Sequence, residues 1–265
     1  MNYLNLFLIL LFFNFTSCED TFQYSPYVSI DKLKYRELNN KNYNEIKNSI
    51  QNQDTFAFTI ISDSHAYYDD FYGAINTLNR NVESAFTIHT GDFSDCGLLW
   101  EYNNNFKIIE KLNKPYLVVI GNHDYLSNGS DIYNHYFGKK NFSIRIGKNK
   151  LVFFDDIVWE SIIHHPDFEW LENEISSTGS DTNVFVVTHI PPWTDQLVGE
   201  KEEIFRKMMA AHDVKAVFCG HEHNFEMKDY YQDSVIYAIS GSVCKRNYLQ
   251  VNITGKTFNI KCIKF

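Results

Sequence analysis

The sequence predicts an α/β fold built as one large domain, and two observations lead to this prediction. Short apolar runs rich in β-branched and aromatic residues alternate with segments whose apolar residues recur at the 3.6-residue period of an amphipathic helix. No internal repeat and no low-complexity linker interrupts this alternation between residues 54 and 265. A length of 265 residues fits one large globular domain or two small ones, and the uninterrupted pattern favours one.

The predicted elements follow in order along the chain. Five apolar runs of strand length are expected to be buried strands: TFAFTIIS (55–62), AFTIHT (85–90), PYLVVI (115–120), NVFVVTHI (183–190) and VKAVFC (214–219). Helical periodicity occurs between them, at 70–82, 98–113, 167–176 and 202–212. Antiparallel strands joined by short turns are expected at 142–147, 150–156, 234–242 and 248–265. Strand–helix units therefore dominate the first half of the domain, and strands dominate its end.

The N-terminal part of the chain predicts export. Its apolar run from Tyr3 to Phe15 is too short to span a membrane and is typical of a signal-peptide core, so residues 1–17 are expected to be a signal peptide. An apolar residue, two small residues and then Cys18 resemble a bacterial lipoprotein site, in which the cysteine is acylated. A plainly secreted chain and a buried apolar segment are the alternatives. Residues 18–53 are expected to form a tether or an extra helical layer before the domain at 54–265.

Charge and cysteine content narrow the classes of function. A formal net charge of −9 argues against a protein that mainly wraps duplex nucleic acid, because that role needs a cationic face. Small anionic substrates held by metal ions remain compatible with an acidic chain. If Cys18 carries lipid, an even number of cysteines remains: Cys96, Cys219, Cys244 and Cys262. Their spacing argues against a thiolate zinc site and leaves open whether they pair or are buried.

Side chains able to bind metal ions follow five of the predicted strands. In chain order these strand ends carry D-S-H (63–65), G-D (91–92), G-N-H-D (121–124), His189 and G-H-E-H (220–223). Ordinary turn residues would not concentrate five of the chain's ten histidines at these places, with His89 close before one of them. D-x-H and H-x-H put two side chains on one side of an extended segment, so both can reach one cluster. Carboxylates, amide oxygens and neutral imidazoles suit Mn, Fe, Zn or Ni.

These blocks, in this order and each after a strand, resemble the calcineurin-like metallophosphoesterase family over roughly Phe56 to His223. THIPPW (188–193) and DFEWLENEI (167–175) also resemble segments common in that family. The resemblance implies a four-layer α-β-β-α sandwich of two mixed β-sheets flanked by helices. It also implies two bound metal ions that act together on a phosphoester.

Carried over by position, the resemblance implies two sets of ligands that share one residue. One metal ion would be bound by Asp63, His65, Asp92 and His223, and the other by Asp92, Asn122, His189 and His221. A metal-bridging hydroxide would attack phosphorus without a covalent phosphoenzyme. His123 would approach the phosphate as general acid or charge stabiliser, and Asp124 would orient the His123 ring. The identity of the ions stays open among Mn, Fe, Zn and Ni.

Asp95 separates the chain from one branch of this family. Purple acid phosphatases carry a tyrosine ligand in G-D-x-x-Y, whereas this chain reads GDFSD and has Asp95 at that place. The segment is nearer to the cyclic-nucleotide phosphodiesterase-like branch, in which an aspartate there is common. Asp95 is therefore also a candidate to support the metal site.

For the other histidines and several aromatic residues, the sequence gives weaker evidence of a role in a functional site. His89 lies within a predicted strand and is expected in the core, whereas His135 and His212 are expected on solvated helix faces. His164 and His165 precede a predicted helix and are candidates for substrate contact. Candidates for stacking on a flat substrate group, which packing explains equally well, are Tyr67, Tyr68, Trp100 and Trp193.

The sequence therefore predicts a metal-dependent phosphoric ester hydrolase, exported and lipid-anchored in a bacterial cell envelope, at the periplasm or the outer surface. Its substrates would be small phosphate mono- or diesters, with nucleotides among the candidates. One alternative is a secreted or anchored nuclease or nucleotide pyrophosphatase on the same centre. Another, from a different class, is a surface binding lipoprotein whose metal site is only structural. The loops carry no code that would identify the substrate.

Overall fold

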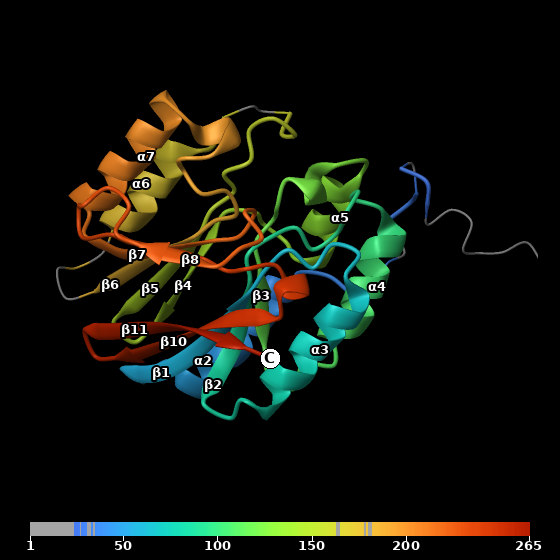
Figure 1. Ribbon diagram of the computed structural model, residues 1–265, viewed down its shortest axis with the longest axis horizontal. Helices are drawn as coiled ribbons and strands as arrows, with labels where there is room; N and C mark the ends of the chain where they lie inside the picture. The colour runs from blue at the N-terminus through green and yellow to red at the C-terminus, as the bar shows by residue number, and fades with distance from the viewer. Residues whose placement is uncertain are drawn as a thin grey trace, which may run out of the picture.

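Two β-sheets lie face to face and helices cover both outer faces, as the sequence predicts (Figure 1). The computed structural model describes residues 24–26, 28–30, 33, 35–162, 165–177, 179 and 182–265. The expected signal peptide and Cys18 lie outside these described residues. No helix in the described ranges has the length and apolar character needed to cross a membrane.

The elements of the first sheet and its helices occupy mainly the first half of the chain. They are α2 (Leu38–Ile50), β1 (Thr55–Ile61), α3 (Tyr68–Arg80), β2 (Ser84–His89), α4 (Leu99–Ile109), β3 (Tyr116–Val118), η2 (His123–Tyr125), α5 (Gly129–Tyr136), β10 (Asn247–Thr254) and β11 (Thr257–Lys264). The strand order is β11-β10-β1-β2-β3. Strands β1, β2 and β3 run parallel to one another, whereas β10 runs antiparallel to both of its neighbours, β1 and β11, so the sheet is mixed.

The second sheet is also mixed. Its elements are β4 (Phe142–Ile146), β5 (Asn149–Phe153), α6 (Phe168–Ser176), β6 (Asn183–Val187), η3 (Asp195–Leu197), α7 (Glu200–Ala211), β7 (Val214–Cys219), β8 (Glu226–Lys228), β9 (Ile236–Ile239) and η4 (Val243–Lys245). The strand order is β4-β5-β6-β7-β9-β8, with parallel pairing from β5 to β9 and antiparallel strands at both edges.

The central strands are continuously apolar because both faces of the sheet are buried there. In β6, Phe185 and Val187 point into the core between the two sheets, whereas Val184 and Val186 pack under α6 and α7. Strands β5 and β7 follow the same rule. Successive side chains of a strand point to opposite faces, so a strand covered on both sides needs apolar residues at every position. Figure 1 shows α3, α4 and α5 on the outer face of the other sheet.

Helix α2 packs against the edge strand β3 and belongs to the folded structure. Its Ile46 and Ile50 lie in the core cluster between the sheets. The side-chain amide of Asn39 donates a hydrogen bond of 2.9 Å to the Val118 carbonyl and accepts one of 2.9 Å from the Val118 N–H. Asn42 donates to the Tyr116 carbonyl at 2.7 Å. Two amide side chains thus pair with the free edge of β3.

The cysteines that the sequence left open are free thiols in the described part of the chain. Cys219 is buried, Cys244 and Cys262 are partly buried, and Cys96 is exposed. None of these four forms a disulfide in the structure. The core therefore depends on packing rather than on covalent cross-links.

Candidate metal centre

The predicted metal-binding residues converge where the strands of both sheets end. Strands β1, β2 and β3 deliver groups from one sheet, and β6 and β7 deliver groups from the other. The backbones of these turns are joined: the Asp63 N–H donates to the Gly91 carbonyl at 3.1 Å, and the Gly220 N–H donates to the His189 carbonyl at 2.9 Å. The site bridges the two sheets at one end of the sandwich, where the His221 N–H donates to Oδ1 of Asp63 at 3.1 Å.

Five of the seven predicted metal ligands have a backbone conformation that is uncommon for residues with a side chain. Their φ angles are positive: Asp63 51°, His65 41°, Asp92 53°, His221 70° and His223 58°. Such a conformation costs free energy and persists where the surrounding structure holds it, often at functional sites. This concentration of strained residues at the strand ends indicates a site rather than ordinary turns.

Close backbone approach explains two of the glycines in these turns. A Cβ atom on Gly121 would lie 2.1 Å from the Asp92 nitrogen, and one on Gly91 would lie 2.5 Å from Nδ1 of His189. Gly91 also has a φ of 101°, which residues with side chains rarely adopt. The two glycines thus allow Asp92, His189 and the 121–124 turn to meet.

One cluster of metal-binding groups forms around His65. Its Nε2 lies 3.2 Å from Nε2 of His223 and 3.5 Å from Oδ2 of Asp92, and Nε2 of His223 lies 3.6 Å from Oδ1 of Asp63. Lone-pair-bearing atoms of Asp63, His65 and His223 all lie within 4.8 Å of one another. Two imidazole nitrogens and nearby carboxylate oxygens that converge in this way could bind one metal ion.

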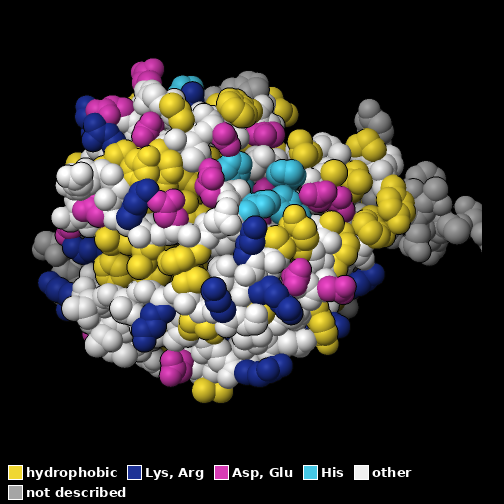
Figure 2. All heavy atoms as spheres, in the orientation of Figure 1, with side chains coloured by type: hydrophobic (Ala, Val, Ile, Leu, Met, Phe, Trp, Pro, Cys, Tyr) yellow, Lys and Arg dark blue, Asp and Glu magenta, His cyan; other side chains and the backbone are white. Residues whose placement is uncertain are grey.

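A second cluster forms around the other oxygen of Asp92. Oδ1 of Asp92 lies 3.3 Å from Nε2 of His189, which lies 3.1 Å from Oδ1 of Asn122. The same Asn122 oxygen lies 3.2 Å from Nδ1 of His221. Asp92 therefore offers one oxygen to each cluster. Figure 2 shows histidine side chains gathered beside acidic side chains on the face of the molecule where these strand ends meet.

Each ligand side chain of the second cluster also forms a hydrogen bond on the side that faces away from the cluster, and this bond determines which of its atoms faces the expected metal ion. Nδ1 of His189 lies 2.8 Å from the Thr90 carbonyl, to which its N–H donates, so Nε2 is free to bind a metal ion. Asn122 donates from its Nδ2 to Oε1 of Glu160 at 3.3 Å, which directs its oxygen inward. Nε2 of His221 lies 2.6 Å from Oδ2 of Asp195, which leaves Nδ1 facing the cluster.

Sequence reasoning missed Glu160 and Asp195. Glu160 lies in a loop and Asp195 begins η3, and no local pattern in the sequence links them to Asn122 or His221. Gln196 connects the two loops, since its Nε2 donates to Oε2 of Glu160 at 3.1 Å and its Oε1 accepts from the backbone N–H of Trp159 at 2.5 Å. Only the tertiary arrangement reveals these supporting contacts.

The pKa values favour the neutral form for three of the four ligand imidazoles and the protonated form for His189. Burial lowers the pKa of His65 to about 4, and it also lowers the pKa values of His221 and His223. Burial alone would lower the pKa of His189, but Asp92 outweighs this and raises it to about 10. Burial raises the pKa of Asp63 to about 7. Buried carboxylates that lie beside mostly neutral imidazoles are stabilised by a bound metal ion, so the residues present fit the metal that the motif implies.

The expected contact between Asp124 and His123 is absent. The two oxygens of Asp124 instead accept hydrogen bonds from the N–H groups of Phe93, Ser94 and Gly121, at 3.0, 2.8 and 3.0 Å. Asp124 is fully buried and ties two site-bearing turns together, because three backbone N–H groups there have no strand partner. The expectation that Asp124 orients the His123 ring is therefore wrong, because its oxygens are taken by these backbone groups.

Asp95 makes the contact that was expected of Asp124. Nδ1 of His123 lies 2.6 Å from the Asp95 carbonyl oxygen, which accepts a hydrogen bond from the ring N–H. The Asp95 carboxylate lies 3.2 Å from Nδ1 of His65. The His123 side chain is 38% exposed, so Nε2 remains available to a substrate at the edge of the clusters. Burial alone would lower the pKa of His123, but Asp92 and Asp95 raise it.

The remaining candidates lie at different places in the fold, some near the site and others away from it. His89 is buried against Phe71 and Phe93, as a core histidine. Tyr67 is 40% exposed and its ring centroid lies 5.9 Å from that of His65. Tyr68 packs against Trp100, and Trp193 stacks on Tyr230. His135 contacts the Leu33 carbonyl, and His212 lies near Glu172. His165 lines a cavity. His164 lies outside the described residues.

Comparison with known proteins agrees with the family resemblance found in the sequence. Residues 56–225 match the sequence model of the family described as calcineurin-like phosphoesterase. The glycerophosphodiester phosphodiesterase GpdQ of Enterobacter lignolyticus (strain SCF1) is 26% identical over 211 residues, covering 70% of each chain. A dimetal phosphatase from Danio rerio has a TM-score of 0.65 at 12% identity, over 80% of this chain and 97% of its own.

A plant enzyme has the same fold. The purple acid phosphatase PPD1 from yellow lupin has a TM-score of 0.64 at 12% identity, over 81% of this chain and 52% of its own. At this identity the two structural likenesses establish the sandwich architecture alone.

Proposed function

Because this chain belongs to the calcineurin-like phosphoesterase family, we propose that it hydrolyses phosphodiesters with two metal ions bound at the strand ends. The chain is a metal-dependent hydrolase of phosphoesters by its family and by its relationship to a glycerophosphodiester phosphodiesterase. The preference for diesters over monoesters rests on the substrate named for that relative. A glycerol-containing diester is accordingly the first candidate substrate.

The observation that supports a dinuclear centre is the position of Asp92 between two sets of donors. Oδ2 of Asp92 faces His65, and Oδ1 faces His189. One ion would be held by Asp63, His65, Asp92 and His223, and the other by Asp92, Asn122, His189 and His221. Bound ions would polarise the phosphoryl oxygens and lower the pKa of an attacking water. Their identity among Mn, Fe, Zn and Ni would depend on availability as well as on these ligands.

His123 would transfer a proton or stabilise charge on the substrate. The Asp95 carbonyl oxygen fixes the Nδ1 side of its ring, so Nε2 is the atom that would donate a proton to the departing alcohol oxygen. Asp124 would act indirectly, by keeping the turns that carry His123 and Asp92 in register.

We also propose export and attachment through acylated Cys18, on the sequence pattern alone. Incorporation of labelled fatty acid into the wild-type chain, and its loss in Cys18→Ser, would test this. Recovery of both proteins unlabelled from the soluble fraction would contradict it.

Turnover of simple phosphoesters tests the proposed activity. The full chain, freed of metal and reloaded with Mn²⁺, is expected to hydrolyse bis-p-nitrophenyl phosphate faster than p-nitrophenyl phosphate. Failure to hydrolyse either compound, or any member of a panel of natural phosphoesters, would exclude the enzyme and leave the binding lipoprotein. Efficient cleavage of nucleic acid or of nucleotide pyrophosphates instead of small diesters would favour the nuclease or pyrophosphatase alternative.

A further inference from the structure

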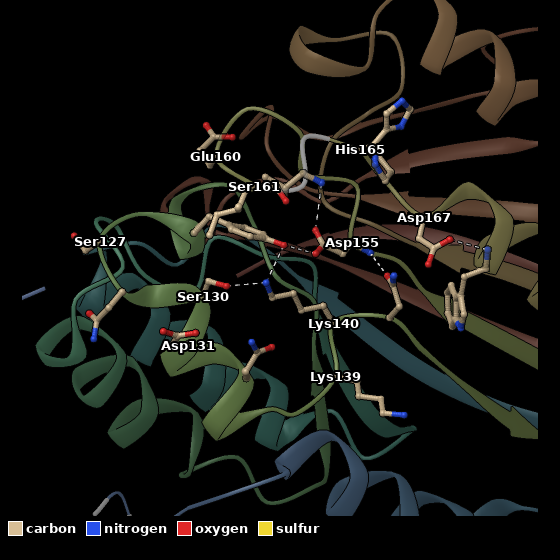
Figure 3. Close-up of a pocket in the computed structure, with 18 residues that line it drawn as sticks. Ser127, Ser130, Asp131, Lys139, Lys140, Asp155, Glu160, Ser161, His165 and Asp167 are labelled. Atoms are coloured by element: carbon tan, nitrogen blue, oxygen red, sulfur yellow. Dashed lines mark hydrogen bonds between the residues drawn. The ribbon is translucent and has the colours of Figure 1, made fainter. Parts of the chain in front are cut away.

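A cavity of about 930 Å³ lies beside the candidate metal centre (Figure 3). The turn that carries Asn122 and His123 continues into its wall at Tyr125. Glu160 also lines the cavity, and one of its oxygens accepts the hydrogen bond from Asn122. The cavity therefore begins one side chain away from an expected metal ligand. A group attached to a phosphate at that centre could extend into it.

Six of the eighteen residues that line the cavity have side chains that form hydrogen bonds without carrying charge. The uncharged polar residues are Ser127, Asn128, Ser130, Asn134, Asn141 and Ser161. Burying such groups against an acyl chain would leave their donors and acceptors unsatisfied, at a cost in free energy. A group rich in hydroxyls or amines would satisfy them. Together with the charged side chains, these groups outnumber the apolar wall residues Ile157, Ile162, Pro166 and Trp170, so the wall favours a polar head group over a lipid tail.

The charged residues of the wall are predominantly acidic. Four carboxylates line the cavity, those of Asp131, Asp155, Glu160 and Asp167, against the amines of Lys139 and Lys140. The Lys140 amine donates to the hydroxyls of Tyr125 and Ser130, at 2.9 and 2.7 Å, and Tyr125 in turn donates to Asp155. Figure 3 shows Lys140 directed toward Ser130 and Asp155. Lys140 and Asp155 are thus both committed to the wall, and the remaining charged side chains, Asp131, Glu160 and Asp167 against Lys139, leave a negative surplus.

We propose that this cavity binds one of the two alcohol groups of a phosphodiester, and that it accepts an uncharged or cationic polar alcohol while rejecting an anionic one. The inference rests on the proposed function, because it requires a diester to be held at the metal centre. It gives the specificity that the ligand motif itself cannot encode, since the motif contacts only the phosphate. A second phosphate or carboxylate on the alcohol would meet Asp131 and Glu160 and be repelled.

Three glycerophosphodiesters that differ only in the second alcohol test this proposal. For the Mn²⁺-loaded full chain, kcat/KM is expected to be at least about tenfold higher with glycerophosphoethanolamine or glycerophosphoglycerol than with glycerophosphoserine, which adds a carboxylate. Equal kcat/KM for all three, or a preference for the serine diester, would overturn the proposal. If none of the three is cleaved and bis-p-nitrophenyl phosphate is also inert, the proposed function fails instead; if only bis-p-nitrophenyl phosphate is cleaved, the proposed occupant is wrong.

Variants at opposite charges of the wall give a second test. Asp131→Asn is expected to reduce the ratio of kcat/KM for the ethanolamine and serine diesters by several-fold, and Lys139→Gln is expected to increase it. Asp69→Asn is the matched control, since Asp69 also lies in the first turn of an exposed helix but does not line the cavity. A ratio unchanged by Asp131→Asn, or changed equally by Asp69→Asn, would contradict the proposal.

Discussion

The Asp195 carboxylate fixes which nitrogen of His221 can bind a metal ion. Its contact of 2.6 Å with Nε2 leaves Nδ1 directed toward Asn122. We expect Asp195→Ala to weaken metal binding about 10- to 100-fold, as loss of an outer hydrogen bond to a ligating histidine typically does. Asp195→Asn should retain much of the affinity, because an amide oxygen can still accept from Nε2. Titration of the metal-free protein with Mn²⁺ would measure this, and equal affinity in Asp195→Ala would refute it.

His123 and Asp92 should respond differently to substitution. His123→Ala is expected to lower kcat by about 10²- to 10⁴-fold, the usual contribution of a general acid, while leaving the metal content unchanged. Asp92→Asn is expected to lose metal as well as activity, because Asp92 offers an oxygen to each cluster. Activity assays paired with elemental analysis distinguish these outcomes. A fully active His123→Ala would show that the proposed proton transfer is wrong.

The sequence predicted residues whose role depends on local spacing, and it missed those whose role depends on tertiary contact. Asp63 and His65 are recognisable because D-x-H follows a buried strand. Nothing near Glu160 or Asp195 in the chain indicates contact with Asn122 or His221. Asp124 and Asp95 illustrate the same limit: both are plausible partners of His123 in sequence, and only the path of the backbone decides that the Asp95 carbonyl makes the contact.

Among the elements, α6 is attached to the second sheet by a half-buried ionic contact. Lys150 of β5 lies 2.7 Å from Oε2 of Glu174 and donates to the Glu174 carbonyl at 2.5 Å, and Ser143 of β4 donates to the same carboxylate at 2.7 Å. The Lys150 side chain is only 7% exposed. Lys150→Met should therefore reduce the free energy of unfolding by about 1–3 kcal/mol, the usual worth of hydrogen bonds to a charged group. Urea denaturation would measure this; an unchanged midpoint would contradict it.

The same contact predicts an acid-dependent loss of stability. Burial alone would raise the pKa of Glu174, but the hydrogen bonds from Lys150 and Ser143 outweigh it and lower the pKa. A carboxyl group whose pKa is lower in the folded state stabilises the fold above its unfolded pKa, and the contribution disappears as the pH falls through the folded value. Stability of the wild type should thus fall more between pH 6 and pH 3 than that of Glu174→Gln. Parallel curves for the two proteins would exclude this contribution.

Element types were predictable from periodicity, whereas some ends were not. The run PYLVVI predicts a strand to Ile120, but ladder pairing of β3 ends at Val118 and the chain turns toward the site. Helix α7 begins at Glu200, two residues before its predicted start, because Gly199 has a φ of 93° that ends the preceding segment. Strand β8 is short and fully exposed, so it has no apolar pattern to predict it. Burial produces a sequence signal, and exposed elements produce little.

At the scale of the molecule, the core between the sheets supports the metal centre. Phe58 is fully buried there, stacked on Phe86 with ring centroids 5.1 Å apart and edge-on to Phe218 of the other sheet. Phe58→Ala should lower the free energy of unfolding by about 3–5 kcal/mol, the cost of a large cavity in a core. Val82→Ala, at a residue 92% exposed, is the control and should change it by less than about 0.5 kcal/mol. Equal midpoints in urea would show that the sheets are not packed through Phe58.

The contact between α2 and β3 also bears on how copies of this protein behave toward one another. A bare edge strand offers its N–H and C=O groups to any extended segment of a second chain. Asn39 and Asn42 occupy those groups on β3 and so block that addition. The double variant Asn39→Ala, Asn42→Ala should consequently form concentration-dependent oligomers that the wild type does not, as sedimentation would detect. Helix α2 thus protects the β3 edge of the first sheet through Asn39 and Asn42.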